Sequence, residues 1–212
     1  MKTFLFDFDG TLVDSMPTFV SVMLRVLDDY QIPYEKDIVK IVTPLGYADT
    51  SKYYVELGVP LTQEEILARF HAYATEEYTY HIPAKKHVIS VLQELKKRGA
   101  DLHVLTASPH AMLDPCLKRL GIYDLFTNVW SCDDFATNKA NPEIYQMAAE
   151  RIGKSVENIL FLDDNYHADK TAKSAGMKVC GVYDDSSKEY VEDMKTITDH
   201  YIYDFEELLK LF

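Results

Sequence analysis

The sequence is poor in cysteine and in basic residues, and each shortage excludes a class of protein. Its 212 residues include only three cysteines, Cys116, Cys132 and Cys180, which lack the spacing of a metal site. This pattern fits reduced thiols better than a disulfide framework, so we expect a cytoplasmic protein. Lys plus Arg number 22 against 34 Asp plus Glu, which gives a formal net charge of −12. Because so acidic a chain repels a phosphate backbone, we expect no nucleic-acid partner.

Long hydrophobic runs, flexible linkers and internal repeats are also missing. No apolar run approaches the ~20 residues that a membrane-spanning helix needs, so we expect no membrane partner. Hydrophobic residues make up 47% and charged residues 26%, an ordinary globular mixture. A chain of this length can form either one sizeable α/β domain or a core domain that carries a smaller insert. The sequence leaves the oligomeric state open.

What the chain does have is a regular alternation of short β-rich runs and amphipathic helical patterns. The predicted strands span residues 4–8, 102–106, 128–131, 159–162 and 179–183. Between them, Ser108-Pro109 and Asn141-Pro142 each predict a helix that starts with an N-cap followed by proline. The alternation predicts an α/β fold, a three-layer, doubly wound, Rossmann-like parallel sheet with helices on both faces.

The alternation stops between residues 15 and 81, where only helical patterns remain. They span residues 19–27, 49–57 and 64–77, and prolines punctuate them. We therefore predict a small all-helical cap domain at 15–81 and a catalytic core made of 1–14 and 82–212. The alternative is one long crossover packed on the sheet, but a single crossover helix needs far fewer residues.

Carboxylates gather where the predicted strands end. Asp7 and Asp9 follow the first strand, before a turn at Gly10, and Asp163-Asp164 follow the fourth. Ligands of open parallel sheets bind beyond the carboxyl ends of the strands, so these side chains are expected to converge. Crowded carboxylates repel one another unless a cation neutralises them, and hard oxygen ligands suit Mg²⁺. Taken alone, the first motif could also be a surface Asp-Gly turn.

Two other predicted strand ends carry further polar residues. Thr106 ends the second strand, with Ala107 and Ser108 directly after it, and Lys139 lies between the third strand and the next helix. All of these residues are expected at the same edge of the sheet as the carboxylates. A surface Asp-Gly turn explains none of this convergence.

With these residues in view, the chain resembles the haloacid dehalogenase superfamily, near its beta-phosphoglucomutase and phosphoglycolate phosphatase branch. The first motif, Asp-Phe-Asp-Gly-Thr-Leu-Val-Asp-Ser, matches in full, and a helical C1-type cap follows it. The other matches are Thr106 for the second motif, Lys139 for the third, and Asp163-Asp164 with Asp169 for the fourth. Lys139 departs from the usual surroundings because no proline follows it directly.

The resemblance implies a magnesium-dependent phosphatase that acts through an aspartyl-phosphate intermediate. Asp7 would attack phosphorus and Asp9 would serve as acid and base. Asp7, the Asp9 backbone carbonyl and Asp164 would hold Mg²⁺, with Asp163 binding it directly or through water. Asp169 would orient these ligands.

The remaining residues would bind the substrate, a small phosphorylated metabolite. Thr106 would donate its hydroxyl to a phosphoryl oxygen, and Lys139 would offset charge on the transferring group. Gly10, Ala107 and Ser108 are the other candidate phosphate-binding residues. From the cap, Tyr47 and Lys52 are candidates for setting specificity.

Three alternatives stay open at this point. A sugar phosphomutase would use the same nucleophile, although Phe19 stands where related mutases place a histidine. A receiver-like signalling module would need its acceptor aspartate at the end of a middle strand, and the third strand ends near Ser131 instead. A non-catalytic phosphate-binding protein would be expected to lose Asp7 or Asp9.

Overall fold

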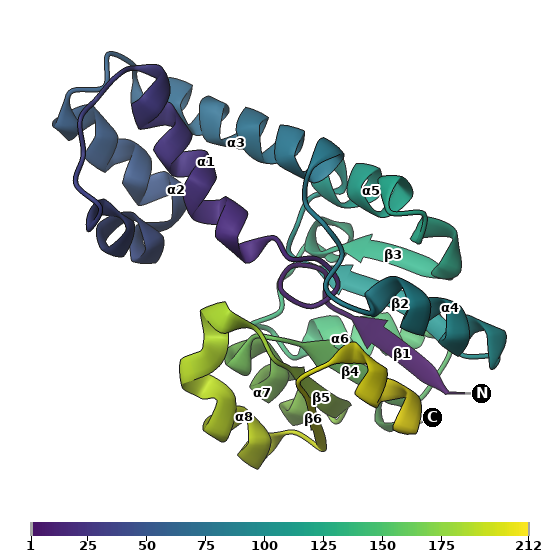
Figure 1. Ribbon diagram of the computed structural model, residues 1–212. Helices are drawn as coiled ribbons and strands as arrows, with labels where there is room; N and C mark the ends of the chain where they lie inside the picture. The colour runs from purple at the N-terminus through teal and green to yellow at the C-terminus, as the bar shows by residue number, and fades with distance from the viewer. Residues whose placement is uncertain (1, 212) are drawn as a thin grey trace. The chain divides into compact units, whose positions relative to one another are not determined.

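The computed structural model describes residues 2–211, which divide into two compact units (Figure 1). One unit, here called the core unit, contains the chain up to Asp14 and from Pro83 onward. The other, the helical unit, is Ser15–Ile82. Among the described residues, no helix is both long and apolar enough to cross a membrane.

Within residues 2–211 the core unit contains a six-stranded sheet in the order β3-β2-β1-β4-β5-β6, with every pairing parallel. The strands are β1 (Thr3–Phe6), β2 (Asp101–Thr106), β3 (Asn128–Ser131), β4 (Ile159–Asp163), β5 (Lys178–Val182) and β6 (His200–Ile202). The predicted α/β fold with a parallel sheet is confirmed. The sixth strand was not predicted, because its sequence, His-Tyr-Ile, is short and has no apolar run.

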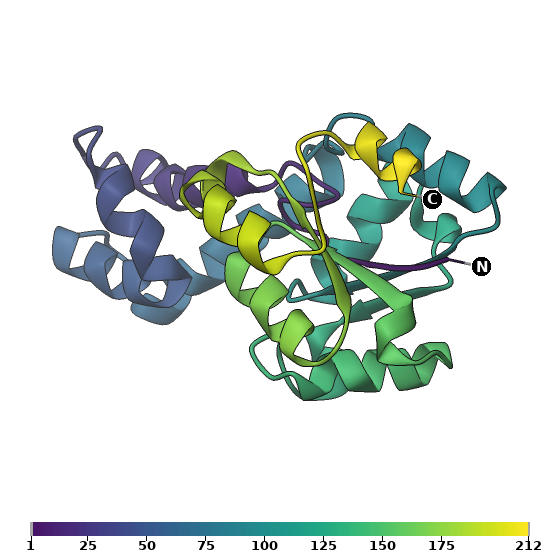
Figure 2. The same cartoon turned by 90° about the horizontal axis from the view of Figure 1, so that it is seen from below.

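Helices cover both faces of this sheet, and Figure 2 shows α6 and α7 on one side and η5 beside α4 on the other. The helices of the core unit are α4 (Val88–Lys97), α5 (His110–Arg119), α6 (Glu143–Ile152), α7 (Tyr166–Ser174), α8 (Val191–Ile197) and the short 3₁₀ segments η1 (Tyr123–Leu125), η2 (Cys132–Phe135), η3 (Val156–Asn158), η4 (Asp185–Tyr190) and η5 (Phe205–Lys210).

Alternate side chains of the strands serve the two faces. Leu5 and Phe161 belong to a buried cluster with α6 and α7, in which the Tyr145 and Phe161 rings lie 5.1 Å apart. The neighbouring Phe6 turns to the other face, where its ring lies 6.1 Å from that of Phe205 in η5. This period of two fixes the register of the central strands, because a slip by one residue would exchange the faces.

The helical unit is formed by α1 (Met16–Asp29), α2 (Ile38–Leu57) and α3 (Gln63–Tyr80), which pack on one another. These helices contain all three predicted helical segments. Helix α2 is interrupted at Gly46, whose φ of 64° is left-handed. Helix α3 starts with a capping box between Thr62 and Glu65.

Two predicted helix starts are each wrong by one residue. Helix α5 begins at His110 and α6 at Glu143, and the N-cap residues are Pro109 and Pro142. The side chain of Ser108 donates a hydrogen bond to Asp9 instead of capping the helix. The local sequence could not show this, because the partner lies 99 residues away.

Candidate active site

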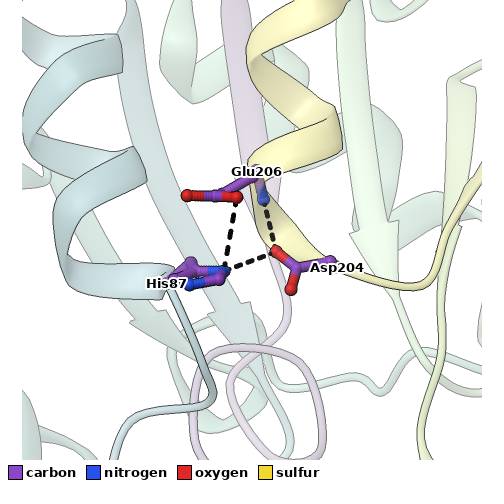
Figure 3. Close-up of side chains that lie close together, drawn as sticks. All are labelled: His87, Asp204 and Glu206. Carbon is purple, nitrogen blue, oxygen red and sulfur yellow. Dashed lines mark hydrogen bonds and ion pairs between the residues drawn. The ribbon is translucent and has the colours of Figure 1, made fainter.

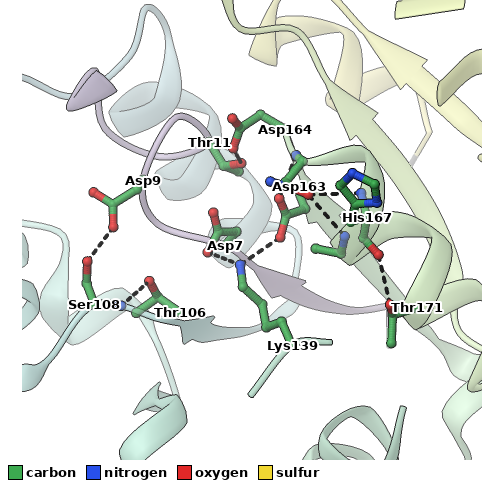
Figure 4. A network of polar contacts seen from close by, with 12 residues as sticks. Asp7, Asp9, Thr11, Thr106, Ser108, Lys139, Asp163, Asp164, His167 and Thr171 are labelled. Carbon is green, nitrogen blue, oxygen red and sulfur yellow. Dashed lines mark hydrogen bonds and ion pairs between the residues drawn. The ribbon is translucent and has the colours of Figure 1, made fainter. Parts of the chain in front are cut away.

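Three central strands deliver polar residues to one edge of the core unit (Figure 4). Thr106 ends β2 and Asp163 ends β4, while Asp7 follows β1, which lies between them. The Asp7 N–H donates to the Leu162 carbonyl at 2.8 Å, so the backbone at Asp7 stays bonded to β4. The chain order reverses between β1 and β4, the place where open sheets bind ligands.

A buried cluster of three carboxylates, here called the buried acidic cluster, lies at this edge. Asp7, Asp163 and Asp164 each offer an oxygen, and these atoms lie within 4.8 Å of one another. Burial and then the neighbouring Asp163 raise the pKa of Asp7 well above its usual value. Burial, Asp163 and then Asp184 raise the pKa of Asp164 to about 7. The protein thus holds like charges together at a free-energy cost.

Lys139 offsets part of this charge. Its ammonium donates to Asp7 at 2.5 Å and to Asp163 at 2.7 Å, and it is mostly buried. Burial alone would lower the pKa of Lys139, but Asp163 and Asp7 outweigh burial and raise it. Lys139 therefore stays protonated. One ammonium cannot balance three carboxylates, so the site is short of positive charge.

Asp9 faces a different neighbour. Its carboxylate accepts a hydrogen bond of 2.5 Å from the Ser108 hydroxyl. The Ser108 N–H in turn donates to the Thr106 hydroxyl oxygen at 3.0 Å. Thr106 therefore keeps its own hydroxyl hydrogen for another acceptor. These bonds link the carboxyl end of β1 to that of β2.

Gly10 and Thr11 fit the loop closely around Asp164. A Cβ atom on Gly10 would lie 2.5 Å from an Asp164 carboxylate oxygen, and the φ of Gly10 is +71°. The Gly10 N–H donates to the Val13 carbonyl at 3.0 Å, inside the loop. Thr11, which was not singled out from the sequence, donates its hydroxyl to Asp164 at 3.1 Å. Gly10 is needed here for the room it leaves beside Asp164.

Asp169 is fully buried on α7, and no described residue hydrogen-bonds to either of its carboxylate oxygens. Burial, Asp163 and Asp164 raise the pKa of Asp169 well above its usual value. The expected orienting role therefore has no hydrogen bond to support it in this structure. Asp169 adds to the excess of carboxyl groups near the cluster.

Lys85 is a residue of this site that the sequence did not reveal. Its ammonium donates to the carbonyls of Gly10 and Tyr183, each at 2.6 Å, and to Asp184 at 2.9 Å. It thus joins the loop after β1 to the segment after β5. Nothing in the local sequence marks Lys85, because Gly10 lies 75 residues away.

The other predicted substrate-binding residues are Ala107 in the core unit and Tyr47 and Lys52 in the helical unit. Ala107 is exposed in the loop after β2. In the helical unit, the Tyr47 ring stacks on Phe19 with centroids 4.8 Å apart, and exposed Lys52 pairs with Asp49 at 2.8 Å. Both side chains thus have partners within the helical unit. That they contact the substrate stays a prediction.

The donor set of the buried acidic cluster fits a small divalent cation. Its members are hard oxygen donors, and burial together with the neighbouring carboxylates raises the pKa of both Asp7 and Asp164. The crowded carboxyl groups outnumber the one ammonium of Lys139, and a doubly charged ion between the carboxylates would remove this imbalance.

Comparison with known proteins agrees with this geometry. The family model of the haloacid dehalogenase-like hydrolases matches residues 4–182. The chain belongs to this family. It is 30% identical over 181 residues to the pyrophosphatase PpaX of Bacillus velezensis, a match that covers 84% of this chain and 81% of that protein. The phosphoglycolate phosphatase of Salmonella paratyphi A is 27% identical over 203 residues, covering 84% and 79%. Family and relatives support a phosphoric ester hydrolase.

Solved structures show the same fold. A candidate beta-phosphoglucomutase from Thermotoga maritima superposes with a TM-score of 0.86 at 23% identity and covers 100% of this chain and 98% of that one. A mutant of CbbY from Rhodobacter sphaeroides, in complex with xylulose-1,5-bisphosphate, gives 0.76 at 17% identity, covering 98% and 96%. At these identities the likeness concerns the fold alone.

Proposed function

We propose that this hydrolase is a magnesium-dependent phosphatase that removes a phosphoryl group from a small metabolite through an aspartyl phosphate on Asp7. The observation that carries the proposal is the buried acidic cluster with Lys139 bonded to Asp7 at 2.5 Å. The phosphatase relatives support small phosphorylated substrates, with pyrophosphate and phosphoglycolate as the first to try. The buried free thiols support a reducing compartment such as the cytoplasm.

Asp7 and Asp164 are the proposed direct ligands of Mg²⁺. Both oxygens of Asp163 already accept hydrogen bonds, from Lys139 at 2.7 Å and from the Asn165 N–H at 2.7 Å. Asp163 is therefore better suited to hold Lys139 in place. Bound Mg²⁺ would supply positive charge for the substrate's phosphoryl oxygens. The Asp9 backbone carbonyl remains the proposed further ligand.

Catalysis would proceed in two displacements. The Asp7 carboxylate attacks phosphorus while the Asp9 carboxyl group gives a proton to the leaving oxygen. Asp9, now a carboxylate, then takes a proton from the water that attacks the aspartyl phosphate. The Ser108 hydroxyl holds Asp9 at 2.5 Å, and Thr106 can donate its hydrogen to a phosphoryl oxygen.

A screen of phosphorylated metabolites, with Mg²⁺ and with a chelator, tests the proposal. Pyrophosphate, phosphoglycolate and sugar phosphates belong in the panel. We expect phosphate release that needs Mg²⁺ and that falls by roughly a thousandfold or more in Asp7→Asn. The matched control is Asp193→Asn, an exposed residue of α8.

Two outcomes would favour the alternatives. Transfer of phosphate between two positions of one sugar, without net release, would indicate a phosphomutase. Binding without turnover of any compound would indicate a non-catalytic phosphate-binding protein. Full activity in Asp7→Asn would exclude Asp7 as the nucleophile.

A further inference from the structure

A cavity of about 380 Å³ lies in the core unit at the amino ends of the strands, the edge opposite the carboxylates. Thr3 and Ile159, which are paired neighbours at the start of β1 and β4, help to line it, and so does Lys178 at the start of β5. Strand β4 runs from Ile159 to Asp163, so at about 3.3 Å per residue the cavity lies roughly 13 Å from the buried acidic cluster. It is a separate place from the active site.

The charge of this cavity is opposite to that of the protein as a whole. Lys2, Lys154, Lys178 and His200 line it, and no Asp or Glu does so among the described residues. The chain carries 34 acidic residues against 22 Lys plus Arg. Within residues 2–211 the ammonium groups of Lys154 and Lys178 form no ion pair, whereas Lys173 nearby pairs with Asp199 at 2.6 Å. At Lys154 and Lys178 the cavity therefore presents positive charge that no carboxylate of residues 2–211 pairs with.

Apolar side chains also line the cavity. Leu160 and Leu211 are half-buried, so they leave part of their apolar surface exposed to it. The lining thus combines an apolar surface with a basic rim.

We propose that this cavity binds a small phosphorylated organic molecule, with its phosphate on the basic rim and its apolar body against Leu160 and Leu211. Lys154 and Lys178 attract and hold the dianion. The size of the cavity suits a ligand of metabolite dimensions. Recognition here does not depend on Asp7 or on a metal, so it stands apart from the proposed catalytic reaction.

Phenylphosphonate is a suitable probe, because it is a dianion with an aromatic ring and its carbon–phosphorus bond resists phosphatases. It would be titrated into the full-length protein in the presence of a chelator, with two-dimensional NMR as the readout. We expect saturable shifts of the amide signals of Thr3, Ile159 and Lys178. Shifts confined to Asp7, Thr106 and Lys139, or no saturable shift, would overturn the proposal. Inorganic phosphate lacks the ring and should bind more weakly; equal affinity would rule out the apolar contact.

Charge-reversal variants give the second arm of the test. The double variant Lys154→Glu/Lys178→Glu should bind phenylphosphonate at least about tenfold more weakly. The matched control is Lys36→Glu/Lys40→Glu, which makes the same change of net charge at exposed sites of the helical unit. If both double variants lose affinity equally, the effect is general electrostatics and the site is refuted.

Discussion

Two clusters in the core unit contain side chains that could bind a metal. They differ in how far other protein groups compensate the charge of their carboxylates. The first is the buried acidic cluster of Asp7, Asp163 and Asp164. The second, shown in Figure 3 and here called the surface cluster, is His87, Asp204 and Glu206. In each, potential ligand atoms lie within 4.8 Å of one another.

In the surface cluster, protein groups already hydrogen-bond to the carboxylate of Asp204. Asp204 accepts hydrogen bonds from the His87 ring at 2.7 Å and from the Glu206 N–H at 2.9 Å, and it caps η5. These bonds lower the pKa of Asp204. In the buried acidic cluster the pKa of Asp7 and that of Asp164 are raised. We therefore expect a metal where the protein leaves charge uncompensated, and not wherever potential ligand atoms lie close together.

The largest expected effect comes from removing one carboxylate charge from the buried acidic cluster, compared with the same change in the surface cluster. Asp164→Asn should lower kcat/KM and the affinity for Mg²⁺ by about 100-fold or more, because it removes a proposed ligand. Asp204→Asn should leave both within about twofold of wild type, since its bonds are structural. The magnesium dependence of phosphate release measures both variants. Equal losses in the two would remove the distinction between the clusters.

The pH dependence of stability should separate the clusters next. Burial and nearby carboxylates raise the pKa of Asp164 in the metal-free folded protein from 3.8 to about 7. A raised pKa favours the folded state at low pH, and this contribution disappears as pH rises through the folded pKa. The Tm without metal should therefore fall as pH rises from about 4 to about 7 and level off above that, and Mg²⁺ should restore more of it at the higher pH.

Two variants control for other titrating groups in this pH window. Asp164→Asn should show a shallower fall of Tm, and Asp204→Asn should keep the wild-type slope. In a protein of this size about 2–4 °C corresponds to 1 kcal/mol, so differences are measurable by scanning calorimetry. A Tm that rises with pH in metal-free wild type would contradict the carboxylate repulsion.

Adjacent lysines allow a smaller test. Lys85 holds the Gly10 carbonyl at 2.6 Å beside the buried acidic cluster, whereas Lys86 lies 3.4 Å from Asp204 and is 77% exposed. Lys85→Met should lower kcat by about tenfold while changing KM little, because it disturbs the position of the loop that carries Asp7 and Asp9. Lys86→Met should be close to wild type. Equal kinetics would show that the Lys85 bonds do not position the loop.

The smallest effect is structural. Asp204→Ala removes the side-chain cap of η5 and should lower the free energy of unfolding by about 1 kcal/mol. Urea denaturation measures this loss, and the affinity for Mg²⁺ should stay unchanged. A loss of metal binding in this variant would mean that the surface cluster, too, holds a cation.

The sequence predicted the positions of those residues that lie at the ends of neighbouring parallel strands. Apolar runs that end in Asp7, Thr106 and Asp163 belong to neighbouring parallel strands, so their ends meet at one edge of the sheet. Contacts between distant segments could not be predicted. Lys85 reaches Gly10 across 75 residues and Ser108 reaches Asp9 across 99. Such pairs depend on loop paths, which hydrophobic periodicity does not encode.

The basic cavity escaped prediction for a related reason. Lys154, Lys178 and His200 are single exposed residues. The register of the sheet places Lys178 and His200, and Lys154 comes from the turn after α6. Strand β6, which places His200, was itself missed. For Asp169 the motif predicted a position near the other carboxylates of the site. It did not predict that the Asp169 carboxylate has no hydrogen-bond partner among the described residues.

The most direct test of the account is the location of a divalent cation in a crystal grown with Mn²⁺ in place of Mg²⁺. Anomalous scattering identifies the ion without reference to activity. We predict one strong peak between the carboxylates of Asp7 and Asp164 and none beside His87 and Asp204. A peak at the surface cluster, or no peak beside Asp7, would contradict the claim that uncompensated buried charge marks the metal site.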